Sequence, residues 1–202
     1  HGHLLEELEP VSTFPLQEND GPDLLLRLRS MLTNLKVGVN HHQKPDLEAL
    51  FMEGKWEDVI RIGDPKDEFE KDIVAQAYLM QGKDLSKNAK LEEDFSKFEQ
   101  AFDKFQKAIE IKPGMHGAYI IWGTALSDLA SLKKDASIFE QAFDKFKKAI
   151  DIKPNIHQVY YNWGHSLSDL AIIKEDFSLF QQACDKFKKA VDINPNYPRA
   201  YA

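Results

Sequence analysis

Three residues that could support nucleophilic catalysis lie close together in the sequence: His165, Ser168 and Asp169. A serine triad needs the nucleophile and the acid on opposite sides of an imidazole ring, at hydrogen-bond distance. His165 and Asp169 are four residues apart, so on a helix they share one face and cannot give that geometry. The Ser-Asp pair also recurs 41 residues earlier, where Thr124 replaces the histidine. We therefore interpret the pair as structural and predict that the chain is not an enzyme.

The other candidate ligands give no pattern that would bind a metal or a cofactor. His41 and His42 are adjacent, so their side chains point apart on any helix, and we interpret them as loop residues. We interpret His1 and His3 as part of an exposed arm. The sequence holds no phosphate-binding glycine loop, no H-E-x-x-H helix and no cysteine pair. It therefore predicts no metal site and no cofactor.

A 41-residue unit organises the chain. Residues 98–138 and 139–179 align without a gap and are identical at 26 of 41 positions, and a third copy begins at Phe180. A match of this length indicates a repeat protein. Cys184 stands where the other copies have phenylalanine, and we interpret it as a small buried core residue rather than a reactive thiol.

Each unit contains two helical patterns. In one, apolar residues recur at i, i+4, i+7 and i+11 over 139–150, and Pro154 ends the helix. In the other, aromatic and apolar residues recur at helical spacing over 160–171, and Gly164 leaves room for a neighbouring helix. Neither helix can bury its apolar stripe alone, so the sequence predicts helix pairs stacked as a solenoid.

These patterns resemble the tetratricopeptide repeat family. The matching positions are Tyr160, Trp163, Gly164 and Leu167 in the first helix and Ala183, Phe187, Ala190 and Pro195 in the second. The resemblance implies an all-α fold, a right-handed α-solenoid of antiparallel helix pairs. The family unit is about 34 residues, and the extra residues here lie between Gly123 and Ala142. We expect them to lengthen the helices, by about two turns in all, rather than to form a loop.

Three regions follow from this reading. Residues 1–21 are predicted to be an ordered arm that caps the stack or lies in a binding groove of the same or a neighbouring molecule. Residues 22–66 hold N-terminal helices: an amphipathic helix over Pro22–Leu35 and then a degenerate tetratricopeptide-like pair. Residues 67–202 form the array of 41-residue repeats, which ends in an incomplete repeat.

Two further predictions concern the start of the array. The degenerate pair is predicted as short helices over Asp46–Glu53 and Glu57–Ile62. In the first helix of the array, over 67–90, the 41-residue step aligns Gly82 with Gly123, whereas a helix of the family's usual length would put Gly82 at its turn. We favour the 41-residue step.

The resemblance places ligands in a concave groove lined by the first helices. The positions it implies are Gln76, Leu79, Met80, Lys83, Gly117, Ile120, Ile121, Thr124, Gln158, Tyr161, Asn162 and His165. Tyr161 and His165 are the most ligand-like, because tyrosine is rigid and amphipathic. These positions differ between the two full copies, while the second helix barely changes. Distinct contacts along one ligand would give this pattern, and so would neutral drift at exposed positions.

Composition and charge limit the classes of partner and the cellular compartment that we expect. The 202 residues carry a net charge of −7 and no lysine–arginine stripe, which argues against nucleic acid and anionic membranes. No apolar run approaches the roughly 20 residues of a membrane helix. A single cysteine allows no internal disulfide, so we expect the cytoplasm or another soluble reducing compartment. The chain begins at His1 rather than Met, and we expect a targeting segment to be missing from it.

We therefore predict a non-catalytic scaffold that binds a protein or peptide partner in the groove. The alternative is a structural module that assembles through end-to-end or arm-mediated self-association, as a homo-oligomer. Residues 197–202 would begin a further first helix. Since terminal repeats normally need a cap, we expect either a longer natural protein or a second subunit over this end.

Overall fold

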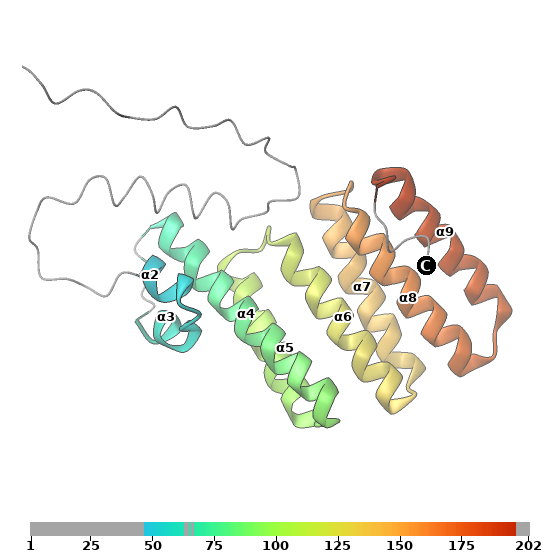
Figure 1. Ribbon diagram of the computed structural model, residues 1–202, viewed down its shortest axis with the longest axis horizontal. Helices are drawn as coiled ribbons and strands as arrows, with labels where there is room; N and C mark the ends of the chain where they lie inside the picture. The colour runs from blue at the N-terminus through green and yellow to red at the C-terminus, as the bar shows by residue number, and fades with distance from the viewer. Residues whose placement is uncertain (1–46, 63–64, 66, 197–202) are drawn as a thin grey trace, which may run out of the picture. The chain divides into compact units, whose positions relative to one another are not determined.

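The computed structural model describes residues 47–62, Pro65 and 67–196, and in these residues it is all-helical, without a strand (Figure 1). The helices are α2 (Leu47–Met52), α3 (Trp56–Ile62), α4 (Glu68–Glu92), α5 (Phe95–Ile111), α6 (His116–Lys133), α7 (Ala136–Ile152), α8 (His157–Lys174) and α9 (Phe177–Ile193). The all-α prediction is confirmed. The predicted arm 1–21, the predicted helix Pro22–Leu35 and His41–His42 lie outside the described residues.

Helices α4 to α9 form three pairs, and the same two-residue connection joins each pair. Its first residue has left-handed backbone and ends the first helix, as Lys134 does with a φ of 53°. Its second residue caps the second helix, as Asp135 does by accepting the backbone N–H of Ser137 at 2.9 Å. Glu93–Asp94 and Glu175–Asp176 repeat this arrangement. A connection this short makes the second helix run back along the first.

The extra residues of each repeat lengthen its helices, as predicted. Helix α6 has 18 residues and α7 has 17, and only two residues separate them. The same lengths recur in α8 and α9. The first helix of each pair is α4, α6 or α8, and the second is α5, α7 or α9.

Within each pair, a glycine of the first helix lies against a phenylalanine ring of the second. A Cβ built on Gly123 would lie 2.6 Å from Cε1 of Phe146, which is closer than real Cβ atoms come. Gly82 with Phe105 and Gly164 with Phe187 show the same 2.6 Å approach. This shared contact confirms the 41-residue register for α4. The alternative, with Gly82 at a turn, is wrong, because Gly82 lies well inside α4.

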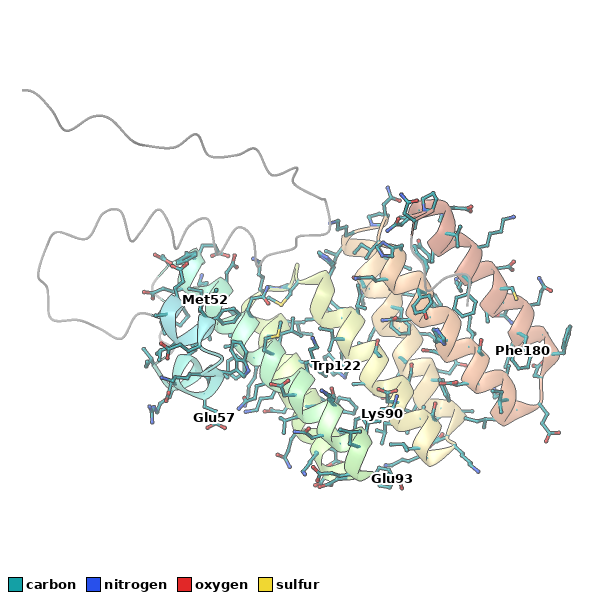
Figure 2. The ribbon with its side chains drawn as sticks, in the orientation of Figure 1. Met52, Glu57, Lys90, Glu93, Trp122 and Phe180 are labelled. Carbon is teal, nitrogen blue, oxygen red and sulfur yellow. The ribbon has the colours of Figure 1, made fainter. Side chains whose placement is uncertain are left out.

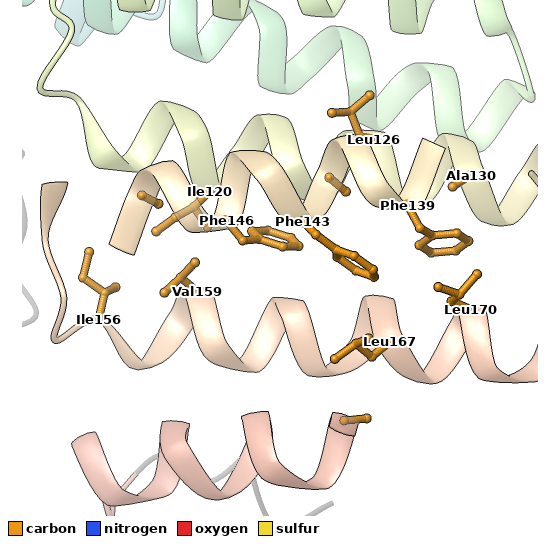
Figure 3. Close-up of a cluster of buried hydrophobic side chains, with 13 residues drawn as sticks. Ile120, Leu126, Ala130, Phe139, Phe143, Phe146, Ile156, Val159, Leu167 and Leu170 are labelled. Atoms are coloured by element: carbon orange, nitrogen blue, oxygen red, sulfur yellow. The ribbon is translucent and has the colours of Figure 1, made fainter. Parts of the chain in front are cut away.

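The first helix of a pair packs against both helices of the preceding pair. Helix α6 contacts α4 and α5 of the preceding pair, and α8 contacts α6 and α7. Figure 3 shows the aromatic side chains of α7, among them Phe139 and Phe146, between α7 and residues of α8 such as Leu170. Phe139 and Phe146 are fully buried, and burying such a side chain contributes roughly 1.5–3 kcal/mol. Contacts between neighbouring pairs are what a solenoid requires; the solenoid arrangement and its right-handed course stay predictions.

The short N-terminal pair packs against the start of the array. Helices α2 and α3 both contact α4, and Val59 of α3 is fully buried. Gly54, with a φ of 73°, turns the chain between them, and the Phe51 and Trp56 rings lie 4.9 Å apart across the turn. The predicted short helices are therefore present. None of the described helices is both long enough and apolar enough to span a membrane.

We expect Gly123→Ala to lower the free energy of unfolding by about 1–3 kcal/mol, because Phe146 is buried and its ring cannot swing away from the new Cβ. Gly117→Ala in the same helix is the control, since no atom lies within 4 Å of its Cβ. It should be neutral or stabilising by up to about 1 kcal/mol. Urea denaturation of both variants measures the difference, and equal effects would contradict the close approach.

Candidate functional site

The predicted groove positions do not form one exposed surface. Leu79 and Ile120 are only 4% and 6% exposed and belong to the core. They therefore offer no surface to a ligand in this structure. The exposed positions are Lys83, Gln158 and His165, and the half-buried ones are Gln76, Met80, Gly117, Ile121, Thr124, Tyr161 and Asn162.

A row of polar contacts joins consecutive first helices, and two of the predicted positions belong to it. Asn162 of α8 donates from its side-chain amide to the Thr124 hydroxyl of α6 at 3.0 Å. Further along, the hydroxyls of Ser127 and Ser166 lie 2.6 Å apart in the buried interface. Thr124 and Asn162 therefore hold α6 against α8.

A third polar contact joins consecutive first helices, and between α4 and α6 it is an ion pair. The Lys90 ammonium lies 2.6 Å from the Asp128 carboxylate, and Figure 2 labels Lys90. In the next interface, 41 residues later, the Ser131 hydroxyl donates to Asp169 at 3.0 Å. Burial raises the pKa of Asp128, and the bond from Lys90 opposes that shift. The equivalent residues Lys90 and Ser131 therefore both face the following first helix.

Tyr161 and His165 occupy the side of α8 that would face a following first helix. They lie 41 residues after Ile120 and Thr124, which α8 covers. Their rings meet edge to face with centroids 4.6 Å apart, and both rings lie near Phe187 of α9, at 5.8 and 5.3 Å. The described part of the chain has no helix after α9. His165 is exposed and Tyr161 is half-buried.

Apolar side chains continue this surface onto α9. Phe180 is 36% exposed, whereas its counterparts Phe98 and Phe139 are fully buried; Figure 2 labels Phe180 on α9. Ile172, the counterpart of Lys90 and Ser131, is 65% exposed. We call this surface the end face: Tyr161, His165, Ile172, Phe180 and Cys184.

The prediction that Cys184 is buried is wrong, because its side chain is exposed. Its counterparts Phe102 and Phe143 stack on Trp122 and Trp163 of the next first helix, with centroids 6.3 and 5.8 Å apart. No such tryptophan follows α9 in the described residues. The position is therefore buried only where a further helix covers it.

Sequence reasoning also missed Ile172 and Phe180 as surface residues. The 41-residue alignment gave no signal of this exposure, because it places Phe180 with two core phenylalanines, Phe98 and Phe139.

The candidate catalytic residues are engaged in helix packing. Ser168 donates to the carbonyl oxygen of Gly164 at 3.1 Å, and Asp169 accepts from Ser131. Both side chains therefore point to partners other than His165. Over the described ranges, no group of three or more His, Cys, Asp or Glu side chains could hold a metal ion.

A small cavity of about 210 Å³ lies between α5, α6 and α7. Its lining residues are Phe102, Trp122, Leu126, Leu129, Ile138, Gln141 and Lys145. The Lys145 ammonium lies 3.5 Å from the centre of the Trp122 ring, and Lys186 repeats this over Trp163 at 3.8 Å. Burial lowers the pKa of both lysines. All seven lining positions recur 41 residues later, with only Ile138 changed, to leucine. We interpret this cavity as a feature of repeat packing.

No family model matches the chain, and no curated protein sequence matches it.

We expect Lys145→Gln to lower the free energy of unfolding by about 0.5–2 kcal/mol, because the desolvated cation–π contact with Trp122 is lost. Lys104→Gln is the matched control. Lys104 is the counterpart one repeat earlier, where Gln81 replaces the tryptophan and the ammonium lies 5.8 Å from Tyr78. Chemical denaturation should give a smaller loss for this variant. If the control cost as much as Lys145→Gln, the cation–π contact would not be the cause.

Proposed function

We propose that this chain is a non-catalytic protein-interaction scaffold of the tetratricopeptide-repeat type, with its first helices arranged along a right-handed solenoid. A protein or peptide partner binds along the side of the array that the first helices α4, α6 and α8 form. The observation that carries the proposal is the aromatic pair Tyr161–His165, which sits on a first helix with its rings 4.6 Å apart and with His165 exposed. Tyrosine concentrates at interfaces because it buries a large rigid area and keeps a polar tip.

The comparison of the repeats supports the same function. The glycine–phenylalanine contact is kept in all three pairs, as are the cap at the connection and the tryptophan that faces the preceding pair in α6 and α8. On the first helices, the buried Ile120 and the half-buried Thr124 of α6 become Tyr161 and the exposed His165 in α8. The packing contacts within the pairs are thus kept along the array, while two positions that α6 uses for packing carry an exposed and a half-buried ring in α8.

The charge of the chain favours a protein partner over nucleic acid. With a net charge of −7, the chain would repel a phosphate backbone, which basic clusters normally neutralise.

Assembly of copies of this chain is the second candidate function. Large apolar side chains exposed at the end of the array favour it, since Phe177 and Phe180 of α9 are 81% and 36% exposed. Exposed apolar clusters of this kind mark interaction sites.

The test is capture of partners from a lysate of the source cells by the wild-type chain and by variants. We expect the double variant Tyr161→Ala/His165→Ala to bind the captured partner at least about tenfold more weakly, as for an interface hot spot. Its melting temperature should change little, because His165 is exposed and Tyr161 only half-buried. Leu91→Ala, at a 73% exposed residue of α4, is the control and should bind normally.

Lys83→Ala distinguishes a partner that binds along the first helices from one that binds only at the end of the array. Lys83 is exposed on α4, two repeats away from His165. A partner that runs along the first helices should lose affinity in this variant too. A folded double variant that keeps its partner would contradict the proposed function.

A further inference from the structure

Repeat packing forms the cavity between α5, α6 and α7 and leaves in its wall an ammonium group without a counter-ion. Lys145 lines the cavity, and its ammonium lies 3.5 Å from the centre of the Trp122 ring, which Figure 2 labels. The neighbouring Asp144 carboxylate is paired with Lys147 instead, at 3.0 Å. Over the described ranges, no carboxylate oxygen lies within ion-pair distance of Lys145, and none of the residues that line the cavity is acidic.

The surroundings of Lys145 make this ammonium a favourable partner for an anion. Its side chain is half-buried, and burial lowers its pKa because the cation loses water. An ammonium has three N–H donors, and the Trp122 ring meets only one side of it. A carboxylate that accepts from the remaining donors forms a charge-assisted hydrogen bond, which solvent screens less here than at an exposed lysine.

The rest of the cavity suits an aromatic ring. The Phe102 and Trp122 rings in its wall are stacked, with centroids 6.3 Å apart and planes inclined by 25°. The other apolar lining residues are Leu126, Leu129 and Ile138. A cavity of about 150 Å³ with this kind of lining holds benzene, so a volume of about 210 Å³ has room for a ring with a short chain.

The equivalent place one repeat earlier lacks these features. Lys104 is the counterpart of Lys145, but Gln81 stands in place of Trp122. The counterparts of Leu129 and Ile138 are Asn88 and Lys97, which are polar. An apolar wall is therefore not required to pair the helices, and Lys104 provides a matched control.

We propose that this cavity binds a small aromatic monocarboxylate, whose ring lies against Phe102 and Trp122 and whose carboxylate accepts hydrogen bonds from Lys145. The site goes beyond the proposed scaffold function and does not depend on it. Because α5 belongs to one helix pair and α6 and α7 belong to the next, the bound acid would hold two neighbouring pairs together.

The test is a titration of the full chain with phenylacetate, followed by NMR through the indole N–H signals. The Trp122 signal should shift with saturation, and the signal of Trp56, which lies in α3, should not. Phenylacetamide has the same ring without the charge, and acetate has the charge without the ring. We expect each of them to bind at least about tenfold more weakly than phenylacetate.

Variants assign the charge and the cavity separately. Lys145→Met should weaken phenylacetate binding at least about tenfold and leave phenylacetamide binding unchanged. Lys104→Met is the control and should alter neither ligand. Ile138→Phe narrows the cavity and should weaken both ligands, because both carry the ring. Circular dichroism checks that each variant is folded, and the comparison of ligands on the wild-type chain needs no variant.

Four results would overturn the inference. The first is a Trp122 signal that does not move at the solubility limit of phenylacetate. The second is equal affinity for phenylacetate and phenylacetamide, which would leave Lys145 without a role. The third is a loss in Lys104→Met as large as that in Lys145→Met. The fourth is tighter binding of octanoate than of phenylacetate, which would assign the cavity to aliphatic acids. The scaffold function stands in each case, since it is tested at Tyr161 and His165.

Discussion

The close approach of a glycine and a phenylalanine ring determines how every helix pair of the array is built. A Cβ at Gly123 would lie 2.6 Å from the Phe146 ring, so only glycine lets the second helix come this near. Trp122, the neighbour of Gly123, lies against Phe102 of the preceding pair and beneath Lys145 of its own. Two adjacent residues thus fix the packing within a pair and the packing between pairs. Because the contacts are between neighbours, the same solution can be repeated at a constant step.

Repetition has a different consequence at the last described pair. Helices α8 and α9 carry the residues that receive a following first helix, but the described residues contain none. Phe180, which would be buried in the interior, is therefore exposed. At the same place Tyr161 and His165 replace the aliphatic and hydroxyl side chains of the preceding copy. The surface that the packing leaves open is thus also where the repeat sequence departs from its pattern.

The sequence predicts the local features of this fold well. The period, the helix ends at Pro154 and the role of Gly164 follow from residue types and spacing alone, because caps, breakers and close approaches act over a few residues. The extra residues of each repeat could also be assigned to helices, since they continue the apolar pattern on both sides of the connection.

Burial on the first helices could not be predicted in the same way. Leu79 and Ile120 were assigned to a groove by their place in the repeat, yet the core includes them, because exposure there depends on a helix about 40 residues further along. Cys184 was assigned to the core for the converse reason, since its counterparts are covered and it is not. The repeat alignment shows which residues are equivalent, and only the packing shows which copies have a neighbour.

The measurement that tests the open end face most directly is amide hydrogen exchange of the whole chain, with each segment of α9 compared with the segment of α7 that precedes it by 41 residues. Backbone amides near Phe187 should exchange faster than those near Phe146, because α8 covers the α6–α7 pair and no described helix covers α9. Equal protection of α7 and α9 in the free chain would contradict the open end face.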